Sequence, residues 1–237
     1  MKHLYVIILV ALASVASVYA AEEGKHLFIL SGQSNMANLA PNVSFTPAVE
    51  AAFSKDNVIV VKDARGSSPI RNWYKNWKPS KGDIPKGNGE LYDRLMLKVN
   101  AAIEGKKIRT VTFVWMQGEH DAAEKNDDVY KESLLGLIKQ LGDDMKRDDV
   151  NYVIGRLSRF RTDEHWEGVR KAQVEAAEAS PRGAWVDTDD VDIDGIHYTA
   201  AGYKELGKRF AEKAIALIKN QPTTRVGDGD AKQANHR

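Results

Sequence analysis

The strongest constraint on the fold is the alternation of short apolar, β-rich segments with longer segments of helical periodicity. Five short segments are expected to form strands: 27–30, 58–62, 111–116, 152–156 and 184–186. Helical periodicity covers residues 91–103, 130–141, 165–179 and 200–218, and Gly105 and Gly142 follow two of these segments as expected C-terminal caps. Strands that alternate with helices form a parallel sheet covered on both faces. The sequence therefore predicts a three-layer α/β/α sandwich whose functional loops leave the carboxyl ends of the strands.

Length and composition fit one ordinary domain. The chain has 237 residues; we assign 21–220 to a single domain and expect the polar, Gly-rich residues 221–237 to form a disordered tail. Basic and acidic residues are balanced at 34 and 33, so no global positive field attracts nucleic acid or an anionic membrane. Cysteine is absent, which excludes disulfides, thiol catalysis and cysteine-based zinc sites.

Residues 1–20 have the pattern of a cleavable signal peptide. A short basic start precedes an apolar run from Leu4 to Val15, and Val18-Tyr19-Ala20 resembles a signal-peptidase site with cleavage after Ala20. The alternative is an uncleaved anchor helix, but the apolar run is shorter than the ~20 residues that a spanning helix needs. We therefore predict export, to the periplasm or outside the cell, with no membrane span after cleavage.

A serine follows the first predicted strand directly, in Gly32-Gln33-Ser34-Asn35-Met36. A serine on a tight turn at a strand end is accessible as a nucleophile, and its backbone N–H is available to an oxyanion. The alternative is a turn whose serine simply caps a helix. The segment also departs from the Gly-x-Ser-x-Gly nucleophile elbow, because Met36 stands where the second glycine belongs.

A second candidate segment, Asp194-Gly195-Ile196-His197, precedes the last predicted helix. A serine nucleophile needs a base, and the base needs an acid that fixes its tautomer; an Asp three residues before a His supplies both from one loop. The alternatives are an ordinary turn with a surface histidine, or a calcium-binding loop that begins at Asp190. That calcium loop requires an acid at its twelfth position, where Ala201 stands.

A polar cluster follows the central predicted strand, in Gln117-Gly118-Glu119-His120-Asp121. Polar groups at the end of a buried strand need partners, and the Gln117 amide suits an oxyanion hole. The alternative for Glu119 and Asp121 is that they only tie neighbouring loops together. His120 and His165 compete with His197 as the base, but neither has an acid at a comparable loop spacing before a helix.

The long stretch 64–89 is predicted to be a surface loop with a functional role, since loops of this length are often functional. Its segment 71–77 concentrates aromatic rings and amides, a composition suited to stacking on sugars and bonding their hydroxyls. The alternative is that Trp73 and Trp77 pack beneath the loop as a satellite core.

Together the three motifs, Gly32-Gln33-Ser34-Asn35-Met36, Trp115-x-Gln117-Gly118-Glu119 and Asp194-Gly195-x-His197, resemble the SGNH hydrolases. They are most similar to the sialate O-acetylesterase-like (SASA) branch, which includes acetylxylan esterases. The likeness extends from about residue 27 to residue 218. It implies a three-layer α/β/α domain and ester hydrolysis without a metal or cofactor.

The resemblance also implies a role for each motif residue. Ser34 is the expected nucleophile, His197 the general base and then acid, and Asp194 the residue that orients His197. The expected oxyanion hole consists of the Ser34 and Gly66 backbone N–H groups and the Gln117 side chain, which stands in for the asparagine of the SGNH name. His120 occupies a position where the branch often has serine. Substrate contacts are expected from Gln33, Asn35, Glu119, Trp73 and Trp77.

The expected activity is removal of O-acetyl groups from a carbohydrate of acetylxylan or sialate type. The expected partner is therefore an acetylated carbohydrate and no nucleic acid. One alternative is a non-catalytic carbohydrate-binding protein on the same scaffold, although pure binding does not need a nucleophile. The other is a lipase-type carboxylesterase, although the sequence has no long apolar lid segment.

Overall fold

The computed structural model describes residues 23–83, 85 and 88–220. The predicted signal peptide and tail lie outside the described residues. One parallel sheet contains five strands in the order β2-β1-β3-β4-β5. Its strands are β1 (Lys25–Gly32), β2 (Val58–Ala64), β3 (Ile108–Met116), β4 (Asn151–Gly155) and β5 (Gly183–Val186). A separate antiparallel hairpin is formed by β6 (Ile193–Asp194) and β7 (His197–Tyr198).

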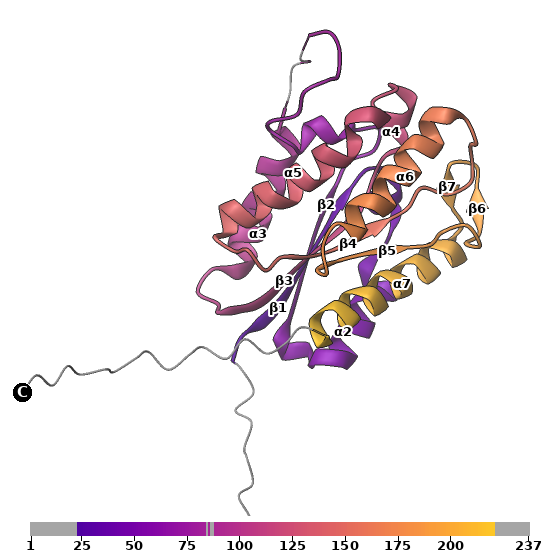
Figure 1. Ribbon diagram of the computed structural model, residues 1–237. Coiled ribbons are helices and arrows are strands. Elements are labelled where there is room, and N and C mark those ends of the chain that lie inside the picture. The colour runs from indigo at the N-terminus through magenta and orange to yellow at the C-terminus, as the bar shows by residue number, and fades with distance from the viewer. Residues whose placement is uncertain (1–22, 84, 86–87, 221–237) are drawn as a thin grey trace, which may run out of the picture.

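Helices cover both faces of the sheet (Figure 1). They are α1 (Ser34–Asn38), α2 (Phe45–Phe53), α3 (Glu90–Ile103), α4 (Glu119–Ala123), α5 (Asp127–Met145), α6 (Glu164–Glu178) and α7 (Ala200–Lys219). Short 3-10 turns are η1 (Pro41–Val43), η2 (Lys55–Asn57) and η3 (Ile70–Asn72).

Alternate residues of the central strands enter two separate cores. Leu27 and Ile29 of β1 pack with α3, α5 and α6, while Phe28 and Leu30 pack with α2 and α7. This period of two is the pattern of a strand buried on both faces, and β3 repeats it. The predicted three-layer sandwich with a central parallel sheet is confirmed.

Most boundaries agree with the periodicity, but one cap was assigned wrongly. Gly105 follows α3 with φ +67°, the expected left-handed conformation. Gly142, however, lies within α5, which continues to Met145 and ends at Lys146 with φ +53°. A Cβ on Gly142 would lie 2.7 Å from the Arg147 carbonyl oxygen, so this glycine permits close backbone packing and does not terminate the helix.

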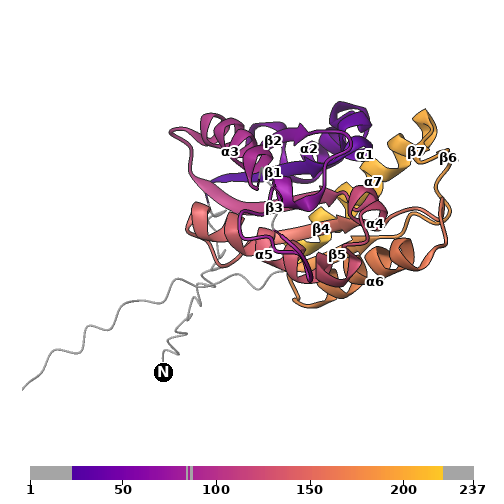
Figure 2. The same ribbon diagram turned by 90° about the horizontal axis from the view of Figure 1, so that it is seen from above.

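The strand order determines where the motifs meet. From β1 the chain moves outward to β2 and then returns to the other side of β1 to form β3. The carboxyl ends of β1 and β3 therefore flank the point where the order reverses, the usual place for a site in an open α/β sheet. Figure 2 shows α1, α4 and the β6–β7 hairpin gathered on this side of the molecule.

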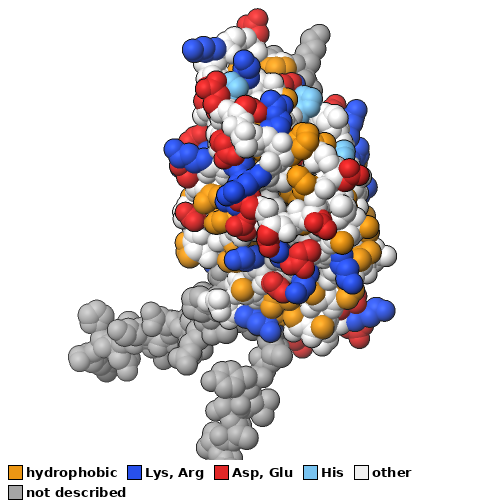
Figure 3. Space-filling model, turned by 90° about the vertical axis from the view of Figure 1, so that its right-hand side faces the viewer, with side chains coloured by type: hydrophobic (Ala, Val, Ile, Leu, Met, Phe, Trp, Pro, Cys, Tyr) orange, Lys and Arg blue, Asp and Glu red, His pale blue; other side chains and the backbone are white. Residues whose placement is uncertain are grey.

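The surface agrees with the balanced charge of the sequence. Figure 3 shows acidic and basic side chains interspersed over one face of the molecule.

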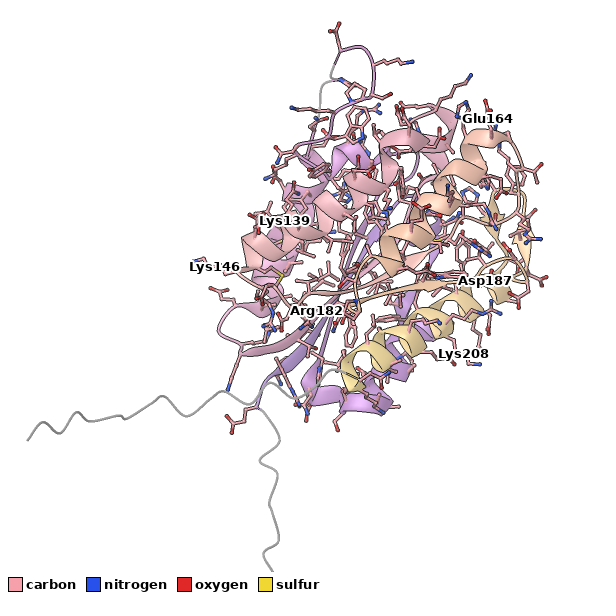
Figure 4. All side chains as sticks on the ribbon, in the orientation of Figure 1. Lys139, Lys146, Glu164, Arg182, Asp187 and Lys208 are labelled. Carbon is pink, nitrogen blue, oxygen red and sulfur yellow. The ribbon has the colours of Figure 1, made fainter. Side chains whose placement is uncertain are left out.

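The direction of β5 can be followed in Figure 4. Asp187, just after β5, lies toward the end of the sheet near the β6–β7 hairpin, and Arg182, just before β5, lies toward the other end. Among the helices of the described part of the chain, none combines the length and apolar character required to cross a bilayer.

Candidate active site

The turn after β1 places Ser34 at the first residue of α1. Gly32 has φ +144°, and a Cβ on it would lie 2.0 Å from the carbonyl oxygen of Met116, the last residue of β3. The Gln33 N–H donates to the same oxygen at 3.0 Å. Only glycine accommodates this approach without a clash. The partly buried Ser34 is thus held between the carboxyl ends of β1 and β3.

The loop after β2 brings Gly66 against Ser34. A Cβ built on Gly66 would lie 3.7 Å from the Ser34 Cβ. The Arg65 N–H donates to the Gly32 carbonyl at 3.1 Å, which fixes the start of this loop on the Ser34 turn. The two residues predicted to supply backbone donors to an oxyanion therefore lie side by side, and Gly66 is exposed to solvent.

Asp194 and His197 are directly opposite each other in the β6–β7 hairpin. Opposite residues of an antiparallel pair project from the same face, so the carboxylate and the imidazole share one face of the hairpin. Gly195, with φ +62°, forms the turn between them. The Thr199 hydroxyl accepts a hydrogen bond from the Gly202 N–H at 3.0 Å and so caps the N-terminus of α7, directly after the hairpin.

One amide connects the hairpin to the Ser34 turn. The Asn35 Nδ2 donates to the Ile196 carbonyl at 3.1 Å, across 161 positions of sequence. Ser34 directly precedes Asn35 in the sequence, and His197 directly follows Ile196. Within the described residues, however, no hydrogen bond joins the side chains of Ser34, Asp194 and His197, so their pairing as a triad stays a prediction.

Gln117 is fully buried, and its side chain ties several segments together. Its Nε2 lies 3.1 Å from Gln33 Oε1, 3.1 Å from the Ser68 carbonyl and 2.5 Å from Asp121 Oδ2. Its Oε1 accepts from the Tyr130 hydroxyl at 3.0 Å. An amide nitrogen has two hydrogens, and acceptors of the protein already surround it. The oxyanion role predicted for Gln117 would require one of these bonds to be replaced by a bond to substrate.

Three residues expected to contact substrate are buried and bonded to the protein. The exposed fractions of Gln33, Asn35 and Glu119 are 4%, 2% and 4%. Gln33 Oε1 also accepts from the His120 backbone N–H at 3.2 Å, and Asn35 Nδ2 donates to Glu119 Oε1 at 2.6 Å. For Glu119, the bond from Asn35 favours the alternative that this side chain ties neighbouring loops together.

The two tryptophans expected to stack on sugar belong to the core. Trp73 and Trp77 are 0% and 2% exposed and pack in the cluster formed with α3, α5 and α6. Trp73 meets Trp115 edge to face, with ring centroids 5.1 Å apart. Neither ring offers a free face to a sugar, so the structure supports the alternative that these aromatics pack beneath the loop.

Each of the two competing histidines has a carboxylate within hydrogen-bonding distance, and neither partner is among the residues expected from the sequence. His165 Nδ1 lies 2.7 Å from Asp127 Oδ1, and His120 Nε2 lies 3.2 Å from Glu124 Oε1. Asp127 was missed because it is 38 positions away on another helix. His120 and Glu124 are four positions apart on the short α4 region, a helical spacing that could have been recognised.

The calcium-loop alternative finds no support at its first position. Arg209 donates to both carboxylate oxygens of Asp190, at 2.6 and 2.9 Å, and these bonds lower the pKa of Asp190 to about 2. The chain then turns into the β6–β7 hairpin. In the described part of the chain, no three His, Asp or Glu side chains are grouped so that they could hold a metal ion.

Two buried carboxyl groups lie behind the turn. Burial raises the pKa of Glu119, against the opposing effect of the hydrogen bond from Asn35. Burial raises the pKa of Asp121 to about 7, although its Oδ2 accepts from the Ile70 N–H at 2.9 Å and from Gln117. Since Ile70 begins η3, in the segment after β2 that also contains Gly66, Asp121 links α4 to that segment.

Comparison with protein families identifies the chain. Residues 37–216 match a family model described as carbohydrate esterase, sialic acid-specific acetylesterase, the SASA family. The chain belongs to this family. The matched range begins after Ser34, so the assignment of the nucleophile depends on the motif and on its position. Comparison with curated proteins gives no match.

Solved structures show the same fold at low sequence identity. A protein from Arabidopsis thaliana has a TM-score of 0.66 at 19% identity, over 84% of this chain and 99% of its own. A carbohydrate acetylesterase from Xanthomonas citri has a TM-score of 0.64 at 16% identity, over 82% of this chain and 57% of its own. A carbohydrate esterase family 3 protein from Talaromyces cellulolyticus has a TM-score of 0.52 at 13% identity, over 84% of this chain and all of its own length, 100%. This SASA family member thus has the SGNH hydrolase fold.

The close approach at Gly32 gives a stability prediction. Gly32→Ala should lower the free energy of unfolding by roughly 2–5 kcal/mol, since the new Cβ clashes with backbone and φ is unfavourable for alanine. Gly66→Ala is the matched control, because its Cβ meets only Ser34 at van der Waals distance. It should change stability by less than about 0.5 kcal/mol in urea unfolding. Equal stability of the two variants would contradict the close approach.

The raised pKa of Asp121 predicts a pH-dependent contribution to stability. Between the unfolded pKa of about 4 and the folded pKa of about 7, the folded state retains a proton that the unfolded state loses, so stability falls as pH rises. Asp121→Asn lacks this titration. The stability of wild type relative to Asp121→Asn should therefore fall by on the order of 4 kcal/mol from pH 4 to pH 7.5. Urea unfolding of both proteins at several pH values measures this difference in stability. If the two stability profiles run parallel over this pH range, the raised pKa of Asp121 is refuted.

Proposed function

We propose that this chain is an exported serine esterase that removes O-acetyl groups from a carbohydrate, with Ser34 as the nucleophile. The observation that carries the proposal is the convergence of three separate segments at the carboxyl ends of β1 and β3. Ser34 begins α1, Gly66 lies against it, and the hairpin that carries Asp194 and His197 is bonded to its neighbour Asn35. Membership of the SASA family supports ester hydrolysis as the reaction.

The proposed reaction has two steps. The Ser34 Oγ attacks the acetyl carbonyl carbon while His197 takes the hydroxyl proton, and Asp194 stabilises the imidazolium that forms. The bond to the sugar oxygen then breaks, and His197 returns the proton to that oxygen. A water molecule next attacks the acetyl-serine, gives its proton to His197, and releases acetate as Ser34 regains its proton.

The negative oxygen of each tetrahedral intermediate needs nearby donors. The proposed donors are the backbone N–H groups of Ser34 and Gly66, two residues that lie side by side in the structure. Gln117 is the proposed third donor, although its Nε2 is surrounded by acceptors of the protein. It contributes to the oxyanion hole only if a bound substrate displaces one of them, and otherwise it supports Gln33 and the Ser68 backbone.

The acyl group and the alcohol are proposed from the family. Its description names a sialic acid-specific acetylesterase, which supports acetyl as the acyl group and a sugar as the alcohol. Trp73 and Trp77 are buried and therefore do not provide a stacking surface for that sugar. Export is proposed from residues 1–20, whose basic start, apolar run and small-residue end fit a signal peptide.

Hydrolysis of p-nitrophenyl acetate tests the nucleophile and the base. Ser34→Ala should reduce turnover to background, and His197→Gln should reduce it by about 10²- to 10⁴-fold. His120→Gln and His165→Gln are matched controls, because each keeps its hydrogen-bonding capacity but removes a competing base. A chelator should leave the wild-type rate unchanged.

Each outcome distinguishes between specific alternatives. Turnover that survives in Ser34→Ala would refute the assignment of the nucleophile, and loss of turnover in His165→Gln in place of His197→Gln would reassign the base. If the wild-type protein is folded but inactive on both aryl acetate and acetylated xylan or sialate, the binding-protein alternative is favoured. Release of acetate from a polymeric glycan, measured in parallel, identifies the carbohydrate.

A further inference from the structure

The side chain of Asn35 is a buried junction between four segments. Its Nδ2 donates to Glu119 Oε1 at 2.6 Å and to the Ile196 carbonyl at 3.1 Å. Its Oδ1 accepts from the Tyr203 hydroxyl at 2.8 Å. Asn35 therefore connects α1 with the segment after β3, with the turn of the β6–β7 hairpin and with α7.

Tyr203 fixes the orientation of this amide. A hydroxyl that donates to Oδ1 turns the NH₂ group toward the other side, where Glu119 and Ile196 provide acceptors. Burial raises the pKa of Tyr203, which keeps its hydroxyl proton available for donation. The same hydroxyl accepts a hydrogen bond from the exposed Asn38 Nδ2 at 3.1 Å, which leaves the hydroxyl proton free to donate to Asn35.

Glu119 determines whether the amide can remain in place. Its side chain is almost completely buried, and Asn35 is the side-chain donor to its Oε1. A buried carboxyl without a partner is unfavourable, so the pair is strongly held together. The contact of Glu119 with the hairpin is thus indirect and passes through Asn35.

The hairpin needs such an anchor. Each of its strands has two residues, and an isolated two-stranded hairpin is at best marginally stable. Ile193, Asp194 and Gly195 are exposed, and the packing of the hairpin comes from Ile196 and Tyr198, which contact the two cores. The bond from Asn35 to Ile196 joins the hairpin at the residue directly before His197.

We infer that Asn35 and Glu119 are positioning residues that hold the hairpin carrying His197 at the correct distance from Ser34. This inference rests on the proposed function. It replaces the earlier expectation that these two side chains bind substrate. Neither touches the reacting atoms: Asn35 acts through the Ile196 carbonyl, and Glu119 acts through Asn35.

The test compares kcat and KM on p-nitrophenyl acetate, a substrate too small to depend on a sugar subsite. Asn35→Ala should lower kcat by about 100-fold, the scale expected when a reacting group is displaced by about 1 Å, and leave KM nearly unchanged. Asn35→Asp retains the acceptor for Tyr203 but has no donor for Ile196, so it should lose kcat similarly. Asn38→Ala is the matched control: it removes an amide from the same helix and the same tyrosine, and should retain wild-type kcat.

Variants of Glu119 test the indirect role. Glu119→Gln keeps an acceptor for Asn35 and should retain most of the kcat, whereas Glu119→Ala should lose about as much as Asn35→Ala. The double variant Asn35→Ala, Glu119→Ala should be no worse than either single variant, because residues that act as one unit are not additive. Thermal unfolding of each variant verifies that it is folded. If an Asn35 variant does not fold, Tyr203→Phe takes its place, because this change removes the hydroxyl that orients the Asn35 amide.

The outcomes separate this inference from the proposed function. Asn35→Ala and Asn35→Asp with the kcat of Asn38→Ala would overturn the positioning role, while inactivity of Ser34→Ala would still uphold the esterase. A rise in KM at constant kcat would assign the pair to substrate binding and also overturn the inference. Activity that persists in Ser34→Ala would refute the proposed function itself.

Discussion

The close approach of the β1 and β3 carboxyl ends is the constraint on which the site depends. Gly32 allows the turn to approach the Met116 carbonyl so closely that a Cβ at this position would lie only 2.0 Å from the carbonyl oxygen. The Gln33 N–H then bonds to that carbonyl, and Ser34 is presented at the start of α1. The Arg65 N–H bonds to the Gly32 carbonyl, so the Gly66 loop depends on the same turn.

A buried polar network fills the space behind this turn. Gln117 joins Gln33, the Ser68 backbone and Asp121, while Asn35 joins Glu119, the Ile196 carbonyl and Tyr203. Such networks are costly when incomplete and specify a single arrangement when satisfied. Ser34 and the turn of the hairpin are at least partly exposed to solvent, whereas the polar residues around them are buried and bonded to other parts of the protein.

Much of the fold could be predicted because local patterns encode it. Each predicted strand agrees with a strand of the sheet to within a few residues, since a strand buried on both faces must be continuously apolar. The helix α2 was missed: Pro47 within its first turn conceals the periodicity of a short segment. The hairpin β6–β7 was expected only as a loop, because two-residue strands have no recognisable period.

The sequence by itself determined the layered α/β architecture, the family, and the three motifs, because periodicity and motif spacing are local properties. Only the tertiary structure decided which motif residues are buried among protein partners and which remain accessible to solvent. Burial placed Trp73 and Trp77 in the core and turned Gln33, Asn35 and Glu119 toward protein partners. These outcomes depend on contacts between residues far apart in sequence, such as Asn35 with Ile196 and Asp127 with His165, and no local pattern specifies which distant groups meet.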